Sequence, residues 1–388
     1  MQNLTIIIKS SNNCNAACIY CSADSSNRTN VTMTPGTIER LFKRLKESYK
    51  ENGYPQTVRL IWHGGEPLTQ RNSFYYRIMD LQSKIMSDLK ITVTHSVQTN
   101  LLLLDKDKIK MFRQLLRRPD GSFTQVGTSI DPVPGIRRIK GDDYLQRWQE
   151  KTALLLAAGL HYGAICVVHN RHLDMVEELY DYFAKLYQKD GATTRFNPLY
   201  NSGRAKFLGE EIHLSPRKWG QFMVNFYKIW SNKGKLIPFR PFKEYDHFHV
   251  NGGLIRSCEV SGNCMNHQLG LNTDGSLYLC GRAIDENVIR LGHLQTSPLI
   301  DIINHSMRNR LRNRLIYLKK ALCGQCRWWD YCHGGCPNES LAYFGTFAAK
   351  SHWCAARRIF LDTIYGSPRI RRKNSASAPL NYQARLLH

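Results

Sequence analysis

The chain lacks any run of apolar residues that is long enough to cross a membrane, although it has 388 residues. A membrane-spanning helix requires about 20 consecutive, mainly apolar residues. The start of the chain, Met1-Gln2-Asn3-Leu4, also lacks the basic and then apolar pattern of a secretory signal. These absences predict a cytoplasmic protein that is not embedded in a membrane.

Acidic residues are scarce relative to basic ones. Asp and Glu number 31 against 54 Lys and Arg, which gives a formal net charge of +23. A field of this sign attracts anions. Nucleic acid, an acidic peptide and an anionic membrane surface would all satisfy it, so the charge alone does not identify a partner. The 14 histidines indicate no metal site, because none is paired at a ligand spacing.

Cysteine, by contrast, is abundant, with twelve residues. In a reducing compartment, clustered thiols are more often metal ligands than disulfides. Cys14, Cys18 and Cys21 follow an apolar run at residues 4–8 with the spacing C-x3-C-x2-C. Each iron of a cubane iron–sulfur cluster can take one thiolate, so three local thiols leave one iron open. A zinc loop is the alternative for this stretch.

Apolar strand-like segments alternate with helical segments through the first half of the chain. Thr34-Pro35, for example, marks a helix start that is followed by an apolar stripe at residues 38–45. Strands joined by helices in this way form a parallel sheet that curls into a full or partial barrel. The sequence therefore predicts an α/β fold, a partial (β/α)6 TIM-like barrel followed by a small cysteine-rich iron–sulfur domain. The expected strands lie at 4–8, 58–62, 91–97, 125–130, 164–168 and 194–197. The expected units are the barrel (1–204), a connecting helical segment (205–250), the cysteine-rich domain (251–362) and a basic flexible tail (363–388).

Polar motifs follow the expected strands, where the loops of βα barrels form the site. Gly64-Gly65-Glu66-Pro67 follows the second strand, and its glycines would let the backbone approach a ligand closely. Gln98-Thr99-Asn100 ends the third strand and Ser129-Ile130-Asp131 the fourth. Each motif alone could be an ordinary turn or strand end. Asp131, Arg195 and Tyr200 also follow strands and could face a substrate or be structural.

Eight further cysteines are closely spaced in the last third of the chain. Eight thiols can saturate two cubane clusters. Zinc is again the alternative, because sites with four thiolates also use short C-x2-C hooks. After three, four and four ligands are counted, Cys166 remains, and its apolar surroundings predict a small buried side chain. The eight are Cys258, Cys264, Cys280, Cys323, Cys326, Cys332, Cys336 and Cys354.

The three-cysteine loop, with the Gly-Gly-Glu-Pro motif one strand later, resembles the radical S-adenosylmethionine (SAM) enzymes. In that family SAM chelates the open iron through its amino and carboxylate groups, and one electron cleaves SAM to a 5′-deoxyadenosyl radical that abstracts a substrate hydrogen. The resemblance implies Cys14, Cys18 and Cys21 as ligands of the first cluster. It implies that Gly64, Gly65 and Glu66 hold the SAM amino group. Ser129 and Arg138, which Arg137 adjoins, would contact the ribose and carboxylate, since a guanidinium can bind both carboxylate oxygens. Tyr20, the aromatic residue before the last cysteine, completes the implied cofactor contacts.

The C-terminal cysteines closely resemble the SPASM domain, a twin-cluster extension of SAM enzymes that modify peptides and proteins. With all four positions of each auxiliary cluster filled by thiolates, the implied roles are electron transfer and scaffolding. The implied cofactors are three [4Fe–4S] clusters and SAM. By this resemblance, one auxiliary cluster is held by Cys258, Cys264, Cys280 and Cys336, and the other by Cys323, Cys326, Cys332 and Cys354.

Two members of the resembled group lead to different substrates. Anaerobic sulfatase maturases, which oxidise a cysteine or serine to formylglycine, place an aspartate directly after the third auxiliary cysteine as a base. Here that position is Gly281, followed by Arg282, which argues against sulfatase maturation. Maturases of ribosomal peptides, including those that form a cyclophane by a carbon–carbon crosslink, tolerate variation there. The sequence therefore favours an oxidoreductase that matures a ribosomal peptide, with cyclophane formation as the narrower prediction and a formylglycine-forming enzyme as the alternative.

The implied partners are a precursor peptide and an electron donor such as flavodoxin or ferredoxin. The chain has no room for a leader-binding domain before Cys14, so the leader would bind the basic surface, the SPASM region or another protein. The positive charge suits an acidic leader. An iron–sulfur or zinc nucleic-acid-binding protein is a third possibility. It ranks low because the basic residues are dispersed and no known nucleic-acid-reading motif is present.

Overall fold

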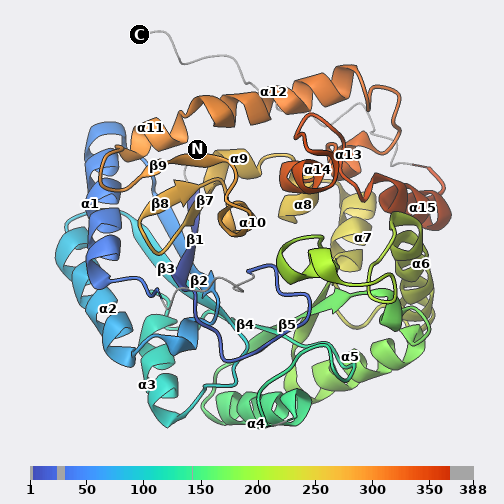
Figure 1. Ribbon diagram of the computed structural model, residues 1–388, viewed down its shortest axis with the longest axis horizontal. Helices are drawn as coiled ribbons and strands as arrows, with labels where there is room; N and C mark the ends of the chain where they lie inside the picture. The colour runs from blue at the N-terminus through green and yellow to red at the C-terminus, as the bar shows by residue number, and fades with distance from the viewer. Residues whose placement is uncertain (1–2, 24–30, 142, 368–388) are drawn as a thin grey trace.

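The computed structural model describes residues 3–23, 31–141 and 143–367. Its first half is a curved sheet of six parallel strands in the order β6-β5-β4-β3-β2-β1, with helices on the outer side (Figure 1). This arrangement confirms the predicted partial barrel. The strands are β1 (Asn3–Ser11), β2 (Thr57–Gly64), β3 (Thr92–Thr99), β4 (Val126–Ser129), β5 (Tyr162–Val168) and β6 (Thr193–Pro198). The outer helices are α1 (Pro35–Asn52), α2 (Asn72–Met86), α3 (Lys106–Leu115), α4 (Tyr144–Ala157), α5 (Val176–Asp190) and α6 (Pro216–Asn232).

The barrel wall follows from the apolar patterns of its elements. In β1 the alternate residues Leu4, Ile6 and Ile8 are fully buried, as a strand with one face against helices requires. Helix α1 begins with Pro35 at its first position and ends at Gly53, whose φ of 64° closes the helix. Its apolar stripe packs into the same core as β1. The local sequence signals are thus sufficient to define this βα unit.

The cysteine-rich half continues the same sheet. Strand β7 (Gln268–Leu271) pairs in parallel with β1, and β8 (Ser276–Tyr278) and β9 (Arg290–His293) follow in antiparallel order. The two halves therefore share a nine-stranded sheet. The helices of this half are α8 (Cys258–Ser261), α9 (Cys264–His267), α10 (Gly281–Asp285), α11 (Leu299–Ile303), α12 (Ser306–Lys320), α13 (Trp329–Cys332), α14 (Pro337–Phe344) and α15 (Cys354–Tyr365).

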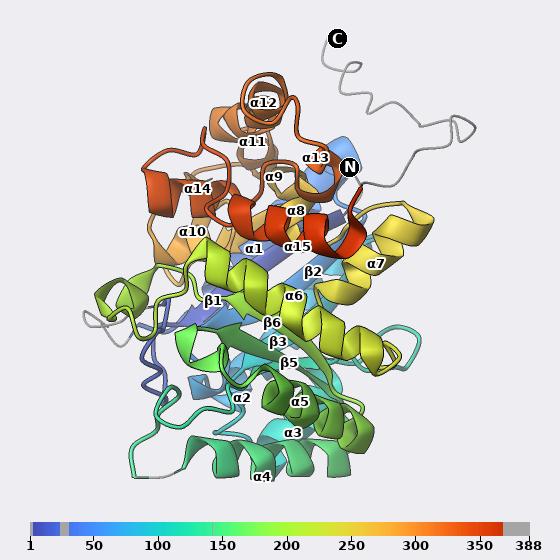
Figure 2. The ribbon, with the colours of Figure 1, turned by 90° about the vertical axis from the view of Figure 1, so that its right-hand side faces the viewer.

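An aromatic cluster fixes the connecting segment against the barrel. Phe196 of β6 lies 4.6 Å, between ring centroids, from Phe226 of α6, and Phe226 stacks on Phe242 of α7 (Phe242–Asn251) at 5.4 Å. Helix α15 packs along α6, as the side view shows (Figure 2). Contact is close because Gly220 has no side chain; a Cβ there would lie 3.0 Å from Ala356. The segment at 205–250 is therefore a packed part of the core.

The predicted tail begins inside a helix, because α15 extends to Tyr365. Residues 368–388 lie outside the described residues, so the prediction of a basic tail there stays a prediction. Among the helices of the described ranges, none combines the length and the apolar character that a bilayer crossing requires.

Candidate functional site

The cysteine loop leaves β1 at its carboxyl end and is held by backbone contacts. The Ala17 N–H donates to the Arg138 carbonyl at 2.7 Å, and the Ile19 N–H donates to the Ile136 carbonyl at 3.0 Å. The pKa of the Cys14 thiol is raised to about 11, mainly by burial, with contributions from Glu66, Cys21 and Cys18. The loop therefore brings its three thiols within electrostatic reach of one another.

The Gly-Gly-Glu motif clamps the start of this loop. The Gly65 N–H donates to the Ser11 carbonyl at 2.8 Å, and the Glu66 N–H donates to the Asn13 carbonyl at 2.7 Å. A Cβ on Gly65 would lie 2.3 Å from the Asn13 oxygen, and one on Gly64, whose φ is 120°, would lie 2.8 Å from the Ser11 oxygen. Only glycine allows the two backbones to approach so closely. The motif positions the cysteine loop, a role that the sequence reasoning did not identify.

The Glu66 carboxylate is buried and fully engaged with the end of β3. It accepts from Thr99 Oγ1 at 2.5 Å and from the backbone N–H groups of Asn100 at 2.7 Å and Leu68 at 2.9 Å. Burial raises the pKa of Glu66 to about 7, although these hydrogen bonds oppose the rise. Asn100 also directs Nδ2 toward Cys14 Sγ at 3.7 Å. Glu66 thus ties the ends of β2 and β3 to the cysteine loop, and its predicted contact with SAM stays a prediction.

Arg137, rather than Arg138, points into the site. Its Nε lies 2.7 Å from Asp131 Oδ2, its Nη2 donates to the Tyr20 hydroxyl at 2.5 Å, and its Nη1 lies 3.8 Å from Cys18 Sγ. Burial alone would raise the pKa of Asp131, but Arg137, His172 and the hydrogen bonds from Tyr20 and the Val167 N–H together hold the pKa below its usual value. Arg138 is exposed and donates to the Gly135 carbonyl. Adjacent arginines in a loop give no sequence signal for which one turns inward.

Ser129 ends β4 at the same edge of the sheet. Its hydroxyl accepts from Gln98 Nε2 at 3.2 Å, and its carbonyl accepts from the Tyr144 hydroxyl at 3.2 Å. Two of the polar motifs therefore meet at the strand ends, as the barrel topology predicts. Cys166 is fully buried, as expected for a structural thiol.

Four of the C-terminal thiols converge beside α10. Cys258 and Cys264 begin α8 and α9, and Cys280 and Cys336 directly precede α10 and α14. Burial raises the pKa of Cys264 well above its usual value, and the other three thiols raise it further. Asn338 donates to Cys280 Sγ at 3.0 Å. These four residues are the group predicted to hold one auxiliary cluster, and they form the first auxiliary group.

The other four thiols meet where α12, α13 and α15 come together. Burial raises the pKa of Cys323, and Cys354 and Cys326 raise it further. The pKa of Cys332 rises to about 11, mainly through burial, with contributions again from Cys354 and Cys326. These residues form the second auxiliary group. The assignment of each group of four cysteines to one cluster, which the resemblance implies, stays a prediction.

The thiol groups match iron–sulfur clusters in their number of ligands. All twelve cysteines are free of disulfides. Within the described residues, no three His, Cys, Asp or Glu side chains lie close enough to hold one metal ion. The thiols of each group nevertheless influence one another's pKa. Each iron of a cubane cluster can bind one thiolate, so donor sets of three, four and four thiols fit [4Fe–4S] clusters.

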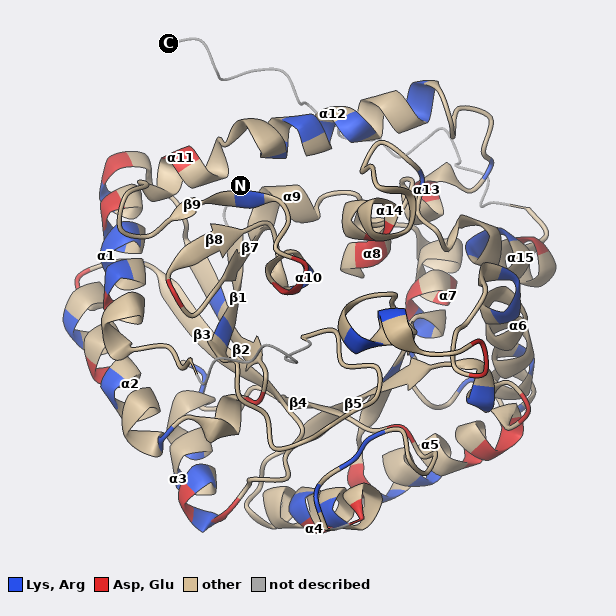
Figure 3. Ribbon diagram, viewed as in Figure 1, with Lys and Arg blue, Asp and Glu red and all other residues tan. Residues whose placement is uncertain are grey.

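Helix α10 lies between the cysteine loop and the first auxiliary group, near the centre of the ring of helices (Figure 3). Lys9 Nζ at the end of β1 lies 3.2 Å from Asp285 Oδ1, and Ser22 Oγ lies 3.5 Å from Asp285 Oδ2. His63 is exposed to solvent, although the loss of bulk solvation lowers its pKa. A Cβ on Gly281 would lie 2.9 Å from Ile7 Cγ2, so a side chain there would require Ile7 to shift.

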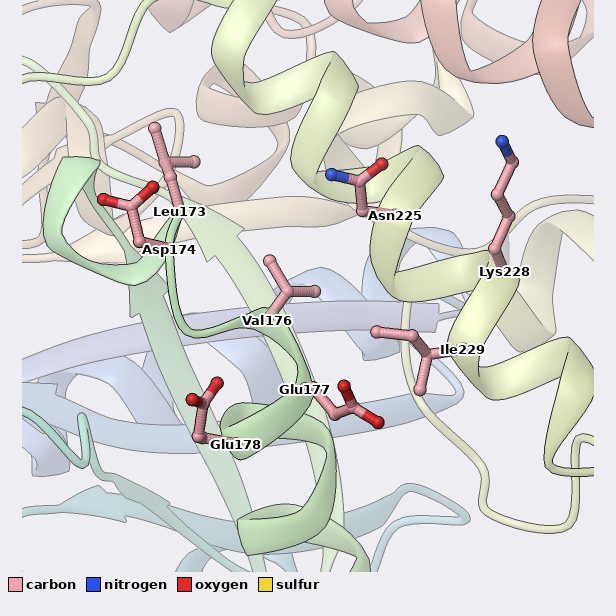
Figure 4. Close-up of a pocket in the computed structure, with 8 residues that line it drawn as sticks. All are labelled: Leu173, Asp174, Val176, Glu177, Glu178, Asn225, Lys228 and Ile229. Atoms are coloured by element: carbon pink, nitrogen blue, oxygen red, sulfur yellow. The ribbon is translucent and has the colours of Figure 1, made fainter.

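A separate cavity of about 480 Å³ lies on the outer helices (Figure 4). Asp174, Glu177 and Glu178 line it at the start of α5, facing Lys228 of α6. Carboxylates at the first turn of a helix are stabilised by the helix dipole. The cavity includes none of the cysteines, so it is not part of the candidate site.

Comparison with known proteins agrees with this geometry. Residues 8–183 match the model of the Radical SAM superfamily, and residues 258–327 match SPASM, an iron–sulfur cluster-binding domain. The chain is similar to the serine-type anaerobic sulfatase-maturating enzyme of Klebsiella aerogenes, with 25% identity over 334 residues that cover 84% of this chain and 77% of the relative. It shares its fold with native anSMEcpe solved with bound AdoMet and Cp18Cys peptide, at a TM-score of 0.77 and 21% identity over 94% of this chain and 97% of that one. It also shares the fold of Streptococcus suis SuiB solved with precursor peptide SuiA, at a TM-score of 0.62 and 13% identity over 92% and 76% of the two chains. The chain is therefore a radical SAM enzyme with a C-terminal SPASM domain, whose cofactors are [4Fe–4S] clusters and SAM.

Proposed function

We propose that this enzyme oxidises a ribosomally made precursor peptide by joining two of its side chains through a carbon–carbon bond, which closes a cyclophane. The observation that carries the proposal is the contact of Ser22, which directly follows Cys21, with Asp285 of α10. A peptide at this contact would lie between the cysteine loop and the first auxiliary group. When SAM is bound to its cluster, it supplies the radical that removes a hydrogen atom from the peptide.

Formation of the crosslink also requires that the peptide lose one proton and one electron. Asp285 is the group that we assign to accept the proton, because Lys9 and Ser22 hold its carboxylate beside the cysteine loop. An iron–sulfur cluster held by the first auxiliary group would supply the acceptor for the electron. Arg282 lies in α10, as Asp285 does, and its guanidinium lies over the Tyr200 ring at 4.5 Å. Anionic or aromatic side chains of a peptide are suited to these surroundings.

Formylglycine formation is the second candidate, because the curated relatives include sulfatase-maturating enzymes at 25% identity. The glycine at position 281 weighs against it, since it supplies no carboxylate there and a side chain would require Ile7 to shift. The assignment of the base to Asp285 serves either reaction. The product, and not the base, distinguishes the two candidates.

Anaerobic co-production of the enzyme with short peptides encoded beside its gene tests the proposal. A crosslink removes two hydrogen atoms, and tandem mass spectrometry then finds no fragmentation between the joined residues. Formylglycine instead reacts with a hydrazide probe and leaves the backbone fragmentation complete. SAM cleavage with unmodified peptides from every such reading frame would contradict a peptide substrate encoded there.

We further propose that an acidic leader binds the basic outer face of this protein and that flavodoxin or ferredoxin supplies electrons. Helix α12 carries Arg310, Lys319 and Lys320 on its exposed side and has no acidic residue (Figure 3). Binding that relies on these charges must weaken between low and physiological ionic strength, because salt screens exposed charges. Precursor binding that is insensitive to salt would contradict the role of charge. Tight, salt-dependent binding of nucleic acid without SAM cleavage would instead favour the nucleic-acid-binding alternative.

A further inference from the structure

The two auxiliary thiol groups are linked by one short segment, Cys332-His333-Gly334-Gly335-Cys336. Cys332 belongs to the second group and Cys336 to the first. Gly335 has a φ of 74°, and a Cβ on it would lie 2.7 Å from Arg357 Nη1 and 2.3 Å from Ser351 Cβ. The guanidinium of Arg357 is therefore packed against the backbone between the two groups.

A buried carboxylate lies beside this segment and joins two arginines. Glu339 Oε2 lies 3.6 Å from Arg357 Nη2, and its Oε1 lies 3.4 Å from Arg282 Nη1. Ser351 donates to Glu339 Oε2 at 2.5 Å and accepts from Arg357 Nη1 at 2.9 Å. The Glu339 side chain is 3% exposed. Such a carboxylate cannot be screened by water, so its charge acts on whatever is nearby.

The two arginines face different thiol groups. Arg282 lies in α10, two residues after Cys280 of the first group, and Glu339 lies in α14, three residues after Cys336 of the same group. Arg357 lies in α15, three residues after Cys354 of the second group. Arg282 and Glu339 therefore act on the first group with opposite signs, while Arg357 acts on the second.

We propose that Glu339 is a positioning residue that sets the reduction potentials of the two auxiliary clusters separately, by holding Arg282 against the first cluster and Arg357 against the second. Added electrons make a cluster more negative, so a nearby cation raises its potential and a nearby anion lowers it. Glu339 lies close to the first group and lowers its potential directly. It also fixes the two cations that raise the potentials of their own groups.

The proposal does not depend on which peptide the enzyme modifies, so it can fail while the proposed function stands, and the reverse. An electrostatic role of Glu339 differs from a purely structural role in the direction of the expected shifts in reduction potential. If the three residues only supported the local structure, removal of Glu339 or of either arginine would weaken the binding of both clusters. An electrostatic device shifts potentials in opposite directions when an anion or a cation is removed.

The test is a redox titration of the reconstituted full-length chain, in which electron paramagnetic resonance monitors the reduced clusters. The variant with Cys14, Cys18 and Cys21 all replaced by Ala is the background, because it leaves only the auxiliary clusters to observe. Glu339→Gln, Arg282→Met and Arg357→Met are compared in this background. Asp246→Asn is the matched control, since this carboxylate also pairs with a cation, Lys235, and with tyrosines, but has no contact with an auxiliary thiol in the described structure.

We expect Glu339→Gln to raise one midpoint potential by about 59 mV or more. This shift corresponds to at least a tenfold change in the one-electron equilibrium constant. Arg282→Met should lower that same potential, and Arg357→Met should lower the other. Asp246→Asn should change neither. Unchanged potentials with full iron content, or shifts in one direction for all three substitutions, would overturn the proposal. If Glu339→Gln does not bind iron, the two arginine variants decide the question. Arg282→Met and Arg357→Met must then each lower a different one of the two potentials.

Discussion

Lys9 and Asp285 form an ion pair across 276 residues of sequence, and it joins the carboxyl end of β1 to the carboxyl end of α10. Both side chains are largely buried, at 15% and 11% exposure. The pair fixes the SPASM half against the edge of the barrel from which the cysteine loop emerges. The position that the proposed proton acceptor occupies is therefore set by the docking of the two halves.

Asp285→Asn should separate SAM cleavage from product formation. The amide keeps the size of the side chain but cannot accept a proton, so we expect product formation to fall by about 10²-fold or more. SAM cleavage should continue, because the cysteine loop is unchanged. The measurement is the ratio of 5′-deoxyadenosine to modified peptide.

Glu286→Gln is the matched control for that substitution. Glu286 is the next residue and also pairs with a lysine, Lys206, but that lysine is 45% exposed and belongs to another segment. The control should retain coupled product formation. Equal losses in both variants would show that a carboxylate at the end of α10 supports the local structure and not proton transfer.

Arg137 and Arg138 provide a second adjacent pair for comparison. Arg137→Met should leave Asp131 as a buried, unpaired carboxylate, and removal of one partner from such a pair costs about 3 kcal/mol or more. It should also remove the cation beside Cys18 and so impair SAM cleavage. Arg138→Met should leave both properties close to wild type, because its exposed side chain donates to the Gly135 carbonyl and, within the described residues, contacts neither Asp131 nor a cysteine. Thermal denaturation and 5′-deoxyadenosine release measure the two effects, and a loss of SAM cleavage in Arg138→Met alone would reverse the assignment.

Replacement of Cys14, Cys18 and Cys21 together by Ala should abolish SAM cleavage and leave the C-terminal clusters in place. Two remaining cubanes correspond to about eight irons per chain, against about twelve in the wild type. Iron and sulfide analysis after anaerobic reconstitution measures this directly. Retained SAM cleavage, or the loss of all iron, would contradict the division of the thiols into three independent groups.

The parts of the fold that the sequence predicts are those with local causes. An apolar alternation in β1, a proline at the start of α1 and a Gly-Gly turn after β2 each act within a few residues, and each has the expected conformation. The pairing of β1 with β7 depends on residues more than 250 positions apart, so periodicity carries no sign of it. The choice between Arg137 and Arg138 depends on the distant backbone that surrounds them. In the sequence, nothing distinguishes Glu339 from an ordinary acidic residue in the first turn of a helix. Only the tertiary structure places it between two arginines.

Acid should destabilise the barrel through His95. Its Nδ1 accepts from Trp62 Nε1 at 3.1 Å, because an indole nitrogen can only donate. The Nε2 atom therefore carries the proton and donates to Gln82 Oε1 at 2.7 Å. This neutral tautomer satisfies both ring nitrogens, and a second proton would have to displace the Trp62 contact.

Burial lowers the pKa of His95 to about 4 from 6.5. The unfolded chain then binds more protons than the folded chain between these two pH values, so the free energy of unfolding falls as the pH drops below about 6.5 and levels off near 4. Between pH 7 and pH 5 the expected loss is about 2 kcal/mol. His95→Gln keeps an acceptor for Trp62 but cannot titrate, so its melting temperature should depend less steeply on pH than that of the wild type. If the melting temperatures of the two proteins depend on pH in the same way, His95 is not the group whose protonation lowers the stability of the barrel.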